Sequence, residues 1–398
     1  MRRTEVAWHE AAGLEGESPM PVPATIQELE AGDLDAAAID AFLEAHAFPL
    51  AEPPFYTFVY RGAADVVRLR HWIFGLATSL PFTRVGRSDV WYRTVEIPDD
   101  SRVEYKIEVV SRGKAGWVAD DLNPQVARDP FGTNSVLAAR GYEEPEWAQS
   151  DPGVSAGSFD ELVIESRAFE SSRRVMVYRP PGFRDARKYP LLVVHDGPEY
   201  LEYSRLGVVL DRLTAALEIP AMVVALVPPQ DRMEEYAADE RHARFVVEEL
   251  LPGLEDAYPL RESAHSRGLM GASLGAVAAF DVARRHPDRF GALLLQSGSF
   301  AFTDIGDAER GSVLEPVIRM MNGYREAPVR VAERVFLSVG VYEPLVSENR
   351  ALVPVLRSTG MDVRFVEARD GHNWENWRDR LRAGLSWLFP GPLWMVYE

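Results

Sequence analysis

Short apolar runs in the second half of the chain constrain its fold more than any other feature. In five of the six runs the apolar centre carries no charge, and stretches with helical spacing separate one run from the next. Unbroken apolar runs are typical of strands covered on both faces, and strands that alternate with helices form a mostly parallel sheet through right-handed crossovers. The runs are Tyr189–Gly197, Ala221–Pro229, Arg267–Ser273, Phe290–Gly298, Arg334–Glu343 and Met361–His372.

Two further segments, Asp160–Glu170 and Ser172–Gly182, precede these runs and resemble an antiparallel pair of strands. Together with the six runs they predict an eight-stranded, mostly parallel sheet with helices on both faces, an α/β fold.

The first half of the chain has a different pattern. From Phe55 onward, short segments rich in β-branched and aromatic residues are separated by Gly, Pro, Asp and Ser, which is typical of an all-β sandwich. Apolar residues at helical spacing in Asp33–Phe48 predict a short helix, and turn residues predict a loop over residues 120–135 and a linker over residues 150–158. We therefore predict three regions: a helical arm over residues 1–50, a β-sandwich over 51–148 and the α/β domain over 158–390.

Composition excludes several kinds of chemistry. The 398 residues contain no cysteine, which excludes disulfides and thiolate nucleophiles and fits a reducing compartment. The net charge of −18 argues against a general nucleic-acid or anionic-membrane partner. Glutamates and glycines interrupt the N-terminal region where a signal peptide would need an apolar core, and we expect no transmembrane segment and a cytoplasmic protein.

The sequence Gly271-Ala-Ser273-Leu-Gly275 is a G-x-S-x-G motif. It lies between an apolar run and the Ala-rich segment Leu274–Phe290, which is the strand–turn–helix context in which such a turn exposes a serine hydroxyl. The motif in this context predicts that Ser273 is a nucleophile. The alternative is a buried Gly/Ser turn with no chemistry.

A serine nucleophile needs a base, and chain order indicates where to find it. In an α/β-hydrolase the acid follows the strand two after the nucleophile, and the histidine follows the last strand. Glu343 ends the corresponding run, and His372 alone among the eight histidines follows the last one. We predict a Ser273–His372–Glu343 triad, with Glu348 and Asp370 as rival acids.

The oxyanion of an acyl-transfer intermediate needs N–H donors held in place in advance. We expect one from Leu274, at the start of the helix after the nucleophile, and one from Gly197, with Asp196 as the second choice. His195 ends its strand and is interpreted as structural. The sequence has no H-E-x-x-H motif, EF-hand loop or G-x-G-x-x-G before a helix, so we expect neither a metal site nor a cofactor.

The chain resembles the enterochelin esterases within the esterase D group of α/β-hydrolases. The resemblance covers most of residues 160–390, and the G-H-x-W-x-x-W-R pattern around His372 is its most specific part. Residues 56–70, 89–98 and 120–125 are similar to the immunoglobulin-like, early-set domain that precedes the hydrolase domain in cytoplasmic enterochelin esterases.

The resemblance implies hydrolysis of the esters of a cyclic trilactone siderophore, which releases iron from the ferric complex. Such a tris-catecholate is a polyanion, and Arg232 matches an Arg-x-x-Glu motif of the family, so we expect Arg232 to bind the substrate and Glu235 to hold Arg232. The competing interpretation of Arg232 is a surface arginine paired with a nearby glutamate.

Two other functions stay open. The esterase D group includes feruloyl and acetyl-xylan esterases and acyltransferases, and Trp72 and Phe74 in the β-sandwich are candidates for a sugar-stacking surface, although aromatic residues in a sandwich are more often core. The third possibility is a binding protein that keeps the hydrolase fold without catalysis.

Overall fold

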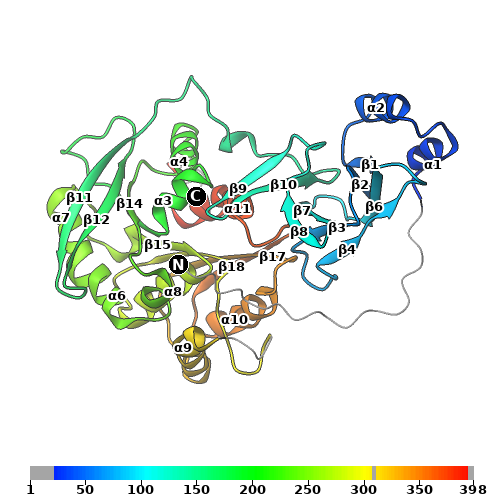
Figure 1. Ribbon diagram of the computed structural model, residues 1–398. Helices are drawn as coiled ribbons and strands as arrows, with labels where there is room; N and C mark the ends of the chain where they lie inside the picture. Colours follow the sequence, from blue (N-terminus) through cyan, green and yellow to red (C-terminus); the bar gives the residue numbers. More distant parts are fainter. Residues whose placement is uncertain (1–21, 307–310, 393–398) are drawn as a thin grey trace. The chain divides into compact units, whose positions relative to one another are not determined.

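A computed structural model describes residues 22–306 and 311–392. The chain divides into two compact units (Figure 1). Unit 1 comprises Met1–Glu143 with the short segment Arg369–Gly371, and unit 2 comprises Glu144–Ala368 with His372–Glu398. Each unit is described by itself below.

Unit 2 is built on an eight-stranded sheet, as predicted. Its order is β11-β12-β14-β13-β15-β16-β17-β18, in which β11, β12 and β14 pair antiparallel and all pairs from β14 to β18 are parallel. The strands are β11 Ser158–Ser166, β12 Ser171–Arg179, β13 Leu191–His195, β14 Val223–Val227, β15 Arg267–Ala272, β16 Ala292–Gln296, β17 Arg334–Gly340 and β18 Asp362–Ala368. All eight predicted strands are therefore present, and the chain has the α/β-hydrolase fold.

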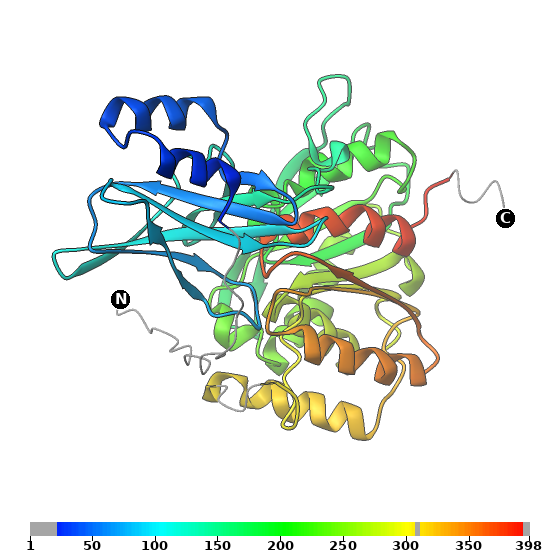
Figure 2. The ribbon, with the colours of Figure 1, turned by 90° about the vertical axis from the view of Figure 1, so that its right-hand side faces the viewer.

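Helices cover both faces of this sheet. Leu191 and Val193 of β13 point into one apolar core with α8, α9 and α10, whereas Leu192 and Val194 point into a second core with α4 and α11. Figure 2 shows α4 and α11 on one side of the sheet and α9 and α10 on the other. The helical elements of the unit are η1 Glu146–Ala148, α3 Gly197–Glu202, α4 Leu206–Ala215, α5 Arg232–Glu235, α6 Glu240–Arg244, η2 Phe245–Leu250, α7 Leu251–Ala257, η3 Ala264–Ser266, α8 Leu274–Arg285, η4 Ser312–Leu314, α9 Glu315–Glu326, α10 Val346–Ser358 and α11 Trp374–Leu388.

Unit 1 contains the predicted β-sandwich. One sheet has the order β1-β2-β6-β5, and the other has the order β4-β3-β7-β10-β9, with β8 also paired to β7. The strands are β1 Leu50–Glu52, β2 Phe55–Arg61, β3 Val66–His71, β4 Ser79–Pro81, β5 Thr83–Arg84, β6 Val90–Glu96, β7 Arg102–Ser111, β8 Lys114–Val118, β9 Val126–Asp129 and β10 Gly132–Ala138.

The helical arm is part of the same unit. Its described helices are α1 Ala24–Ala31 and α2 Ala36–Ala45, and the first 21 residues of the predicted arm lie outside the described residues. The side chain of Asp35 caps α2 by accepting from the N–H of Ala38 at 2.8 Å. Ile26 and Ile39 share an apolar core with Val59 of the sandwich, so burial on a sheet face stabilises these short helices.

Two expectations about the sandwich need correction. The predicted loop over residues 120–135 is wrong beyond Gln125, because β9 and β10 form a hairpin there and β10 also pairs with β7. Aromatic residues of a sandwich are more often part of its core, but Trp72 and Phe74 are 46% and 48% exposed. Their side chains are therefore available at the surface of unit 1.

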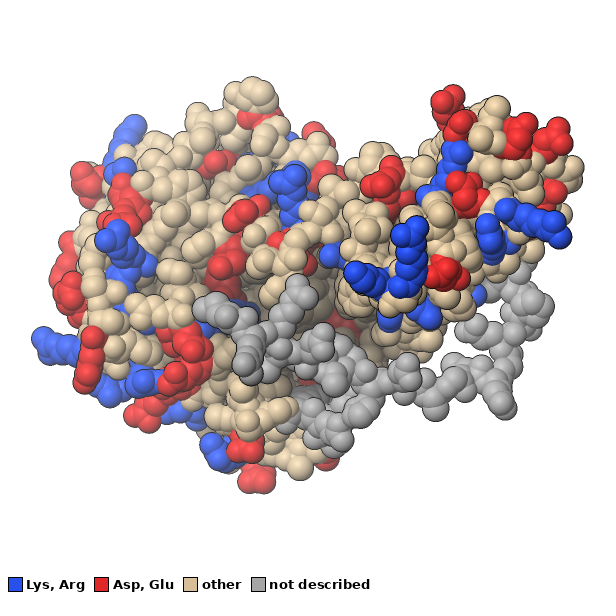
Figure 3. Space-filling model, in the orientation of Figure 1, with Lys and Arg blue, Asp and Glu red and all other residues tan. Residues whose placement is uncertain are grey.

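The surface of unit 2 carries both signs of charge. In the view of Figure 3, Asp and Glu are interspersed with Lys and Arg on this unit. In the described part of the chain, no helix has the length and apolar character needed to cross a membrane.

Candidate active site

Ser273 lies in a tight turn between β15 and α8. Its backbone has φ 57° and ψ −124°, a left-handed conformation that is strained for a residue other than glycine. The turn leaves no room at its first glycine, because a Cβ on Gly271 would lie 2.3 Å from the carbonyl oxygen of Gly275. Ser273 is half-buried, unlike Ala272 before it and Leu274 after it, which are buried. The motif therefore builds the exposed-serine turn that the sequence predicted.

The predicted base and acid are hydrogen-bonded to each other. Nδ1 of His372 lies 2.5 Å from Oε2 of Glu343, which is fully buried, whereas the His372 side chain is 35% exposed. The other oxygen of Glu343, Oε1, accepts from the backbone N–H of Gly340 at 2.5 Å and from the hydroxyl of Ser297 at 2.6 Å. Three donors thus face this carboxylate, and together they fix its orientation.

The rival acids have other environments. Glu348 is buried in α10, and Asp370 forms an ion pair with Arg102 at 3.5 Å within unit 1. Neither is hydrogen-bonded to His372, whose Nδ1 contacts Glu343. Of the three candidate acids, geometry favours Glu343.

The hydroxyl of Ser273 does not contact His372 in this structure. Its hydrogen-bonding partner is instead the hydroxyl of Ser299, at 3.2 Å between the two Oγ atoms. Hydrogen bonds between nucleophile and base are often absent without substrate and form in the reacting complex.

Gly197 and Leu274 are the first residues of α3 and α8, and N–H groups at this helix position have no partner within the helix. Their strands, β13 and β15, are neighbours in the sheet, and a Cβ on Gly275 would lie 3.0 Å from Oδ2 of Asp196. The loop after β13 therefore lies against the start of α8. The N–H of Asp196 donates to the hydroxyl of Tyr236 at 3.2 Å, so Gly197 is the better placed donor of the two.

Arg232 and Glu235 are not paired, so the expected contact between them is wrong. Nε and Nη2 of Arg232 donate to the carboxylate of Asp196 at 2.8–3.1 Å. Glu235 is buried, forms a double hydrogen bond with Arg173 of β12 at 3.1 and 2.5 Å, and also accepts from the backbone N–H groups of Gln230 and Asp231.

The engaged carboxylate of Glu235 is therefore no candidate for substrate contact, whereas the Arg232 side chain is 37% exposed. Burial alone would lower the pKa of the Arg232 guanidinium, but hydrogen bonding and charge attraction to Asp196 raise it, so the side chain keeps its charge.

His195 is part of a buried polar cluster. Its Nδ1 lies 3.0 Å from the carbonyl oxygen of Met270, and its Nε2 lies 2.9 Å from Nε2 of His242. Burial lowers the pKa of His195 to about 4 and lowers that of His242 well below its ordinary value. Both rings are thus neutral near pH 7 and support the strand ends as structural residues.

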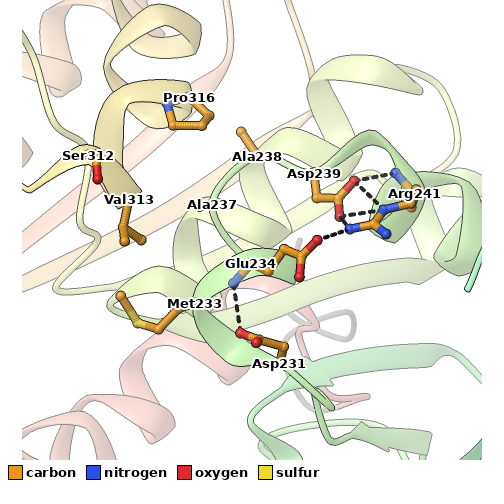
Figure 4. Close-up of a pocket in the computed structure, with 10 residues that line it drawn as sticks. All are labelled: Asp231, Met233, Glu234, Ala237, Ala238, Asp239, Arg241, Ser312, Val313 and Pro316. Carbon is orange, nitrogen blue, oxygen red and sulfur yellow. Dashed lines mark hydrogen bonds and ion pairs between the residues drawn. The ribbon is translucent and has the colours of Figure 1, made fainter. Parts of the chain in front are cut away.

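An open pocket of about 530 Å³ lies between α5 and the start of α9 (Figure 4). It is lined by Asp231, Met233, Glu234, Ala237, Ala238, Asp239, Arg241, Ser312, Val313 and Pro316. None of these is a member of the predicted triad. Figure 4 shows Arg241 held by Glu234 and Asp239, and Asp231 adds a third carboxylate, so the pocket lining has an excess of negative charge. Within residues 22–306 and 311–392, no group of three or more His, Asp or Glu side chains is arranged to hold a metal ion.

Two residues beside the triad were missed by the sequence reasoning. Ser297 contacts Glu343, and Ser299 contacts Ser273. Both follow β16, the strand between the nucleophile strand and the acid strand. Small polar residues at the carboxyl end of a strand beside the nucleophile strand are the signal that could have identified them.

Comparison with known proteins places the chain in an esterase family. Residues 166–388 match the family model described as putative esterase. The chain is 26% identical over 330 residues to an iron(III) enterobactin esterase of Escherichia coli O6:H1, covering 76% of this chain and 80% of that protein.

Two solved structures share the fold. The enterobactin esterase FES from Shigella flexneri, determined in the presence of enterobactin, has a TM-score of 0.68 and 23% identity and covers 86% of this chain and 94% of its own. A ferulic acid esterase has a TM-score of 0.51 and 23% identity and covers 59% of this chain and 98% of its own.

Proposed function

We propose a serine-esterase mechanism for this chain, which belongs to the putative esterase family and is a carboxylic ester hydrolase similar to the enterochelin esterases. Ser273 is the nucleophile, His372 the general base and then the general acid, and Glu343 the residue that orients and stabilises His372. The hydrogen bond between Nδ1 of His372 and buried Glu343 supports this assignment most strongly, because it directs Nε2 as the proton acceptor.

The reaction has two half-steps. The Oγ of Ser273 attacks the ester carbonyl while Nε2 of His372 takes its proton, and the N–H groups of Leu274 and Gly197 bind the oxyanion. The alcohol then leaves with the proton from His372, and a water activated by the same base releases the acid from the acyl-enzyme.

The proposed substrate is a ferric tris-catecholate trilactone, an anionic ester with iron as its cargo. Two observations support it. Similarity to iron(III) enterobactin esterases extends over three quarters of this chain, whereas the ferulic acid esterase covers little more than half of it. Arg232 also offers a partly exposed cation, because Nε and Nη2 contact Asp196 and Nη1 remains for a substrate oxygen.

An ester panel tests this proposal. Purified protein is assayed on a ferric trilactone siderophore, a feruloyl sugar, an acetylated sugar and a p-nitrophenyl ester, with the Ser273→Ala variant as the blank for each. The expected result is the highest kcat/KM on the ferric trilactone. A higher kcat/KM on either sugar ester would reject the siderophore assignment while retaining the mechanism.

The role of Arg232 is tested in the same panel. Arg232→Lys keeps the charge but loses the planar double contact with Asp196, and Arg244→Gln is the control because Arg244 is a surface arginine of α6 paired with Glu248. A tenfold or larger rise in KM for the ferric anion, with neutral esters unaffected, is expected for a substrate contact. Equal losses on neutral and anionic esters would instead limit Arg232 to holding Asp196.

A carbohydrate-linked ester is the second candidate. Exposed Trp72 and Phe74 of unit 1 favour it, since exposed aromatic rings are suited to stacking on sugar rings. Affinity electrophoresis of the wild type and of a Trp72→Ala/Phe74→Ala variant in gels containing soluble xylan tests it. A retardation that the variant abolishes would support this candidate, and equal mobility with and without xylan would reject it.

A further inference from the structure

The segment Gln296–Ser299 begins at the last residue of β16, which lies between the nucleophile strand β15 and the acid strand β17. We propose that Ser297 in this segment is a positioning residue, which holds Glu343 and the aromatic ring beside His372 in one fixed arrangement. This inference rests on the proposed triad.

The hydroxyl of Ser297 makes two hydrogen bonds of opposite sense. It donates to Oε1 of Glu343 at 2.6 Å and accepts from the indole Nε1–H of Trp377 at 2.9 Å. The ring of Trp377 stands edge-on to that of His372, with 5.1 Å between centroids and an interplanar angle of 90°. One buried hydroxyl therefore links the acid to a ring that packs against the base.

The backbone of Ser297 fixes where this hydroxyl points. Its φ of 46° is left-handed, a conformation that costs a non-glycine residue about 1–2 kcal/mol. The N–H of Ser297 donates to the carbonyl oxygen of Ser338 in β17 at 2.7 Å, and the residue is completely buried. Strain of this kind persists only where the surroundings impose it, and here the two side-chain contacts explain it.

The same segment also holds the nucleophile turn. The N–H of Ser273 donates to the carbonyl oxygen of Gln296 at 2.9 Å. The N–H of Ser299 donates to the carbonyl oxygen of Ser273 at 3.2 Å. The side chain of Gln296 donates to the carbonyl oxygen of Trp377 at 2.8 Å. These contacts tie one short segment to the turn of Ser273 and to the helix that follows His372.

A merely structural serine would make similar bonds, and the chain offers such a residue as a matched control. Ser166 is also buried, donates its hydroxyl to the Glu249 carboxylate at 2.5 Å and accepts from the N–H of Phe169 at 3.1 Å. Replacing either serine with alanine removes the hydroxyl that donates to a carboxylate, and it also leaves an N–H group without its acceptor. The two variants should lose comparable stability, and only the one at Ser297 should lose turnover.

The test measures kcat and KM on a p-nitrophenyl ester together with urea unfolding. Ser297→Ala is expected to lower kcat about 10- to 100-fold with KM within about threefold, the size expected for a lost hydrogen bond to a charged group. Ser166→Ala is expected to keep kcat. Ser297→Gly also lacks the hydroxyl but relieves the left-handed backbone, so it should lose as much kcat as Ser297→Ala. Near-wild-type turnover in Ser297→Gly would overturn the inference by assigning the effect to backbone strain.

A double-mutant cycle tests whether Ser297 acts through Glu343. In the Glu343→Gln background, Ser297→Ala is expected to change kcat by less than about twofold, because the group through which it acts is already altered. If Glu343→Gln is severe and the two losses multiply, the inference about Ser297 fails while the triad stands. If Glu343→Gln leaves kcat unchanged, the acid of the proposed triad is wrong and Ser297 has no such role.

Discussion

Replacing Glu343 with glutamine changes a carboxylate that faces three donors. These are Nδ1–H of His372, the backbone N–H of Gly340 and the hydroxyl of Ser297. A carboxylate accepts all three, but a glutamine side chain has one accepting oxygen and two N–H donors of its own. One of the three bonds must therefore be lost or reversed.

The geometry indicates which bond reverses. If the glutamine amide faced Gly340, two buried N–H donors would meet at 2.5 Å, and an unsatisfied buried donor costs about 1–3 kcal/mol. The amide therefore faces His372 and donates to Nδ1, which moves the ring proton to Nε2 and removes the acceptor that Ser273 needs. We expect kcat to fall roughly 10³- to 10⁴-fold, about 4–5.5 kcal/mol, as in the equivalent change of the serine-protease triad.

The assay is steady-state hydrolysis of a p-nitrophenyl ester, with the free energy of unfolding measured in urea on the same samples. Glu348→Gln is the matched control, since it replaces another buried glutamate, and it should lower stability without lowering kcat more than a few-fold. The reasoning is refuted if Glu343→Gln keeps more than a tenth of kcat while Glu348→Gln or Asp370→Asn loses most of it.

Two further predictions concern the nucleophile and the buried histidines. Ser273→Ala and His372→Ala should each lower kcat by several orders of magnitude, and the double variant should be no worse than the worse single one; multiplied losses would separate the two roles. Burial lowers the pKa of His195 from 6.5 to about 4, so the unfolded chain binds a proton that the folded chain does not, and stability should fall by roughly 3 kcal/mol as pH drops from about 6.5 to 4. His242→Gln keeps an N–H facing His195 and removes one titrating group, so the loss of urea stability over that pH range should become shallower by about one proton; an unchanged slope would contradict this.

The parallel sheet could be predicted from the sequence because strands buried on both faces need unbroken apolar runs, such as Leu191–His195. The hairpin of β9 and β10 has a weaker sequence pattern. Neither strand has a clear alternation of polar and apolar residues, since β9 reads VARD and β10 reads GTNSVLA, and β10 is held by its pairing with β7, about thirty residues earlier in the chain. Pairing at that separation has no local signature, so the turn residues of the segment predict a loop instead.

The same distinction applies to the site. Ser273 and His372 can be proposed from the sequence because a motif and a chain order constrain them. The partner of Arg232 cannot be predicted in the same way. Glu235 lies three residues from Arg232, a spacing that suits an ion pair, but its carboxylate contacts Arg173 of β12 instead. The pairing of carboxylates with guanidinium groups depends on how strands that are distant in the sequence are placed. The spacing of residues within one short helix does not determine this pairing.

The strand order also explains why the site needs an internal support. His372 follows β18, which is three positions away from the nucleophile strand β15. At the usual spacing of neighbouring strands this is about 14 Å, farther than an imidazole side chain reaches by itself. For the proposed triad to form, the chain before α11 must bring His372 back over β17 and β16. The contacts that hold α11 there include the hydrogen bonds of Gln296 and Ser297 to Trp377 and the packing of Leu294 in the apolar core. Residues at the end of the intervening strand thus contribute to this support, whichever ester occupies the site.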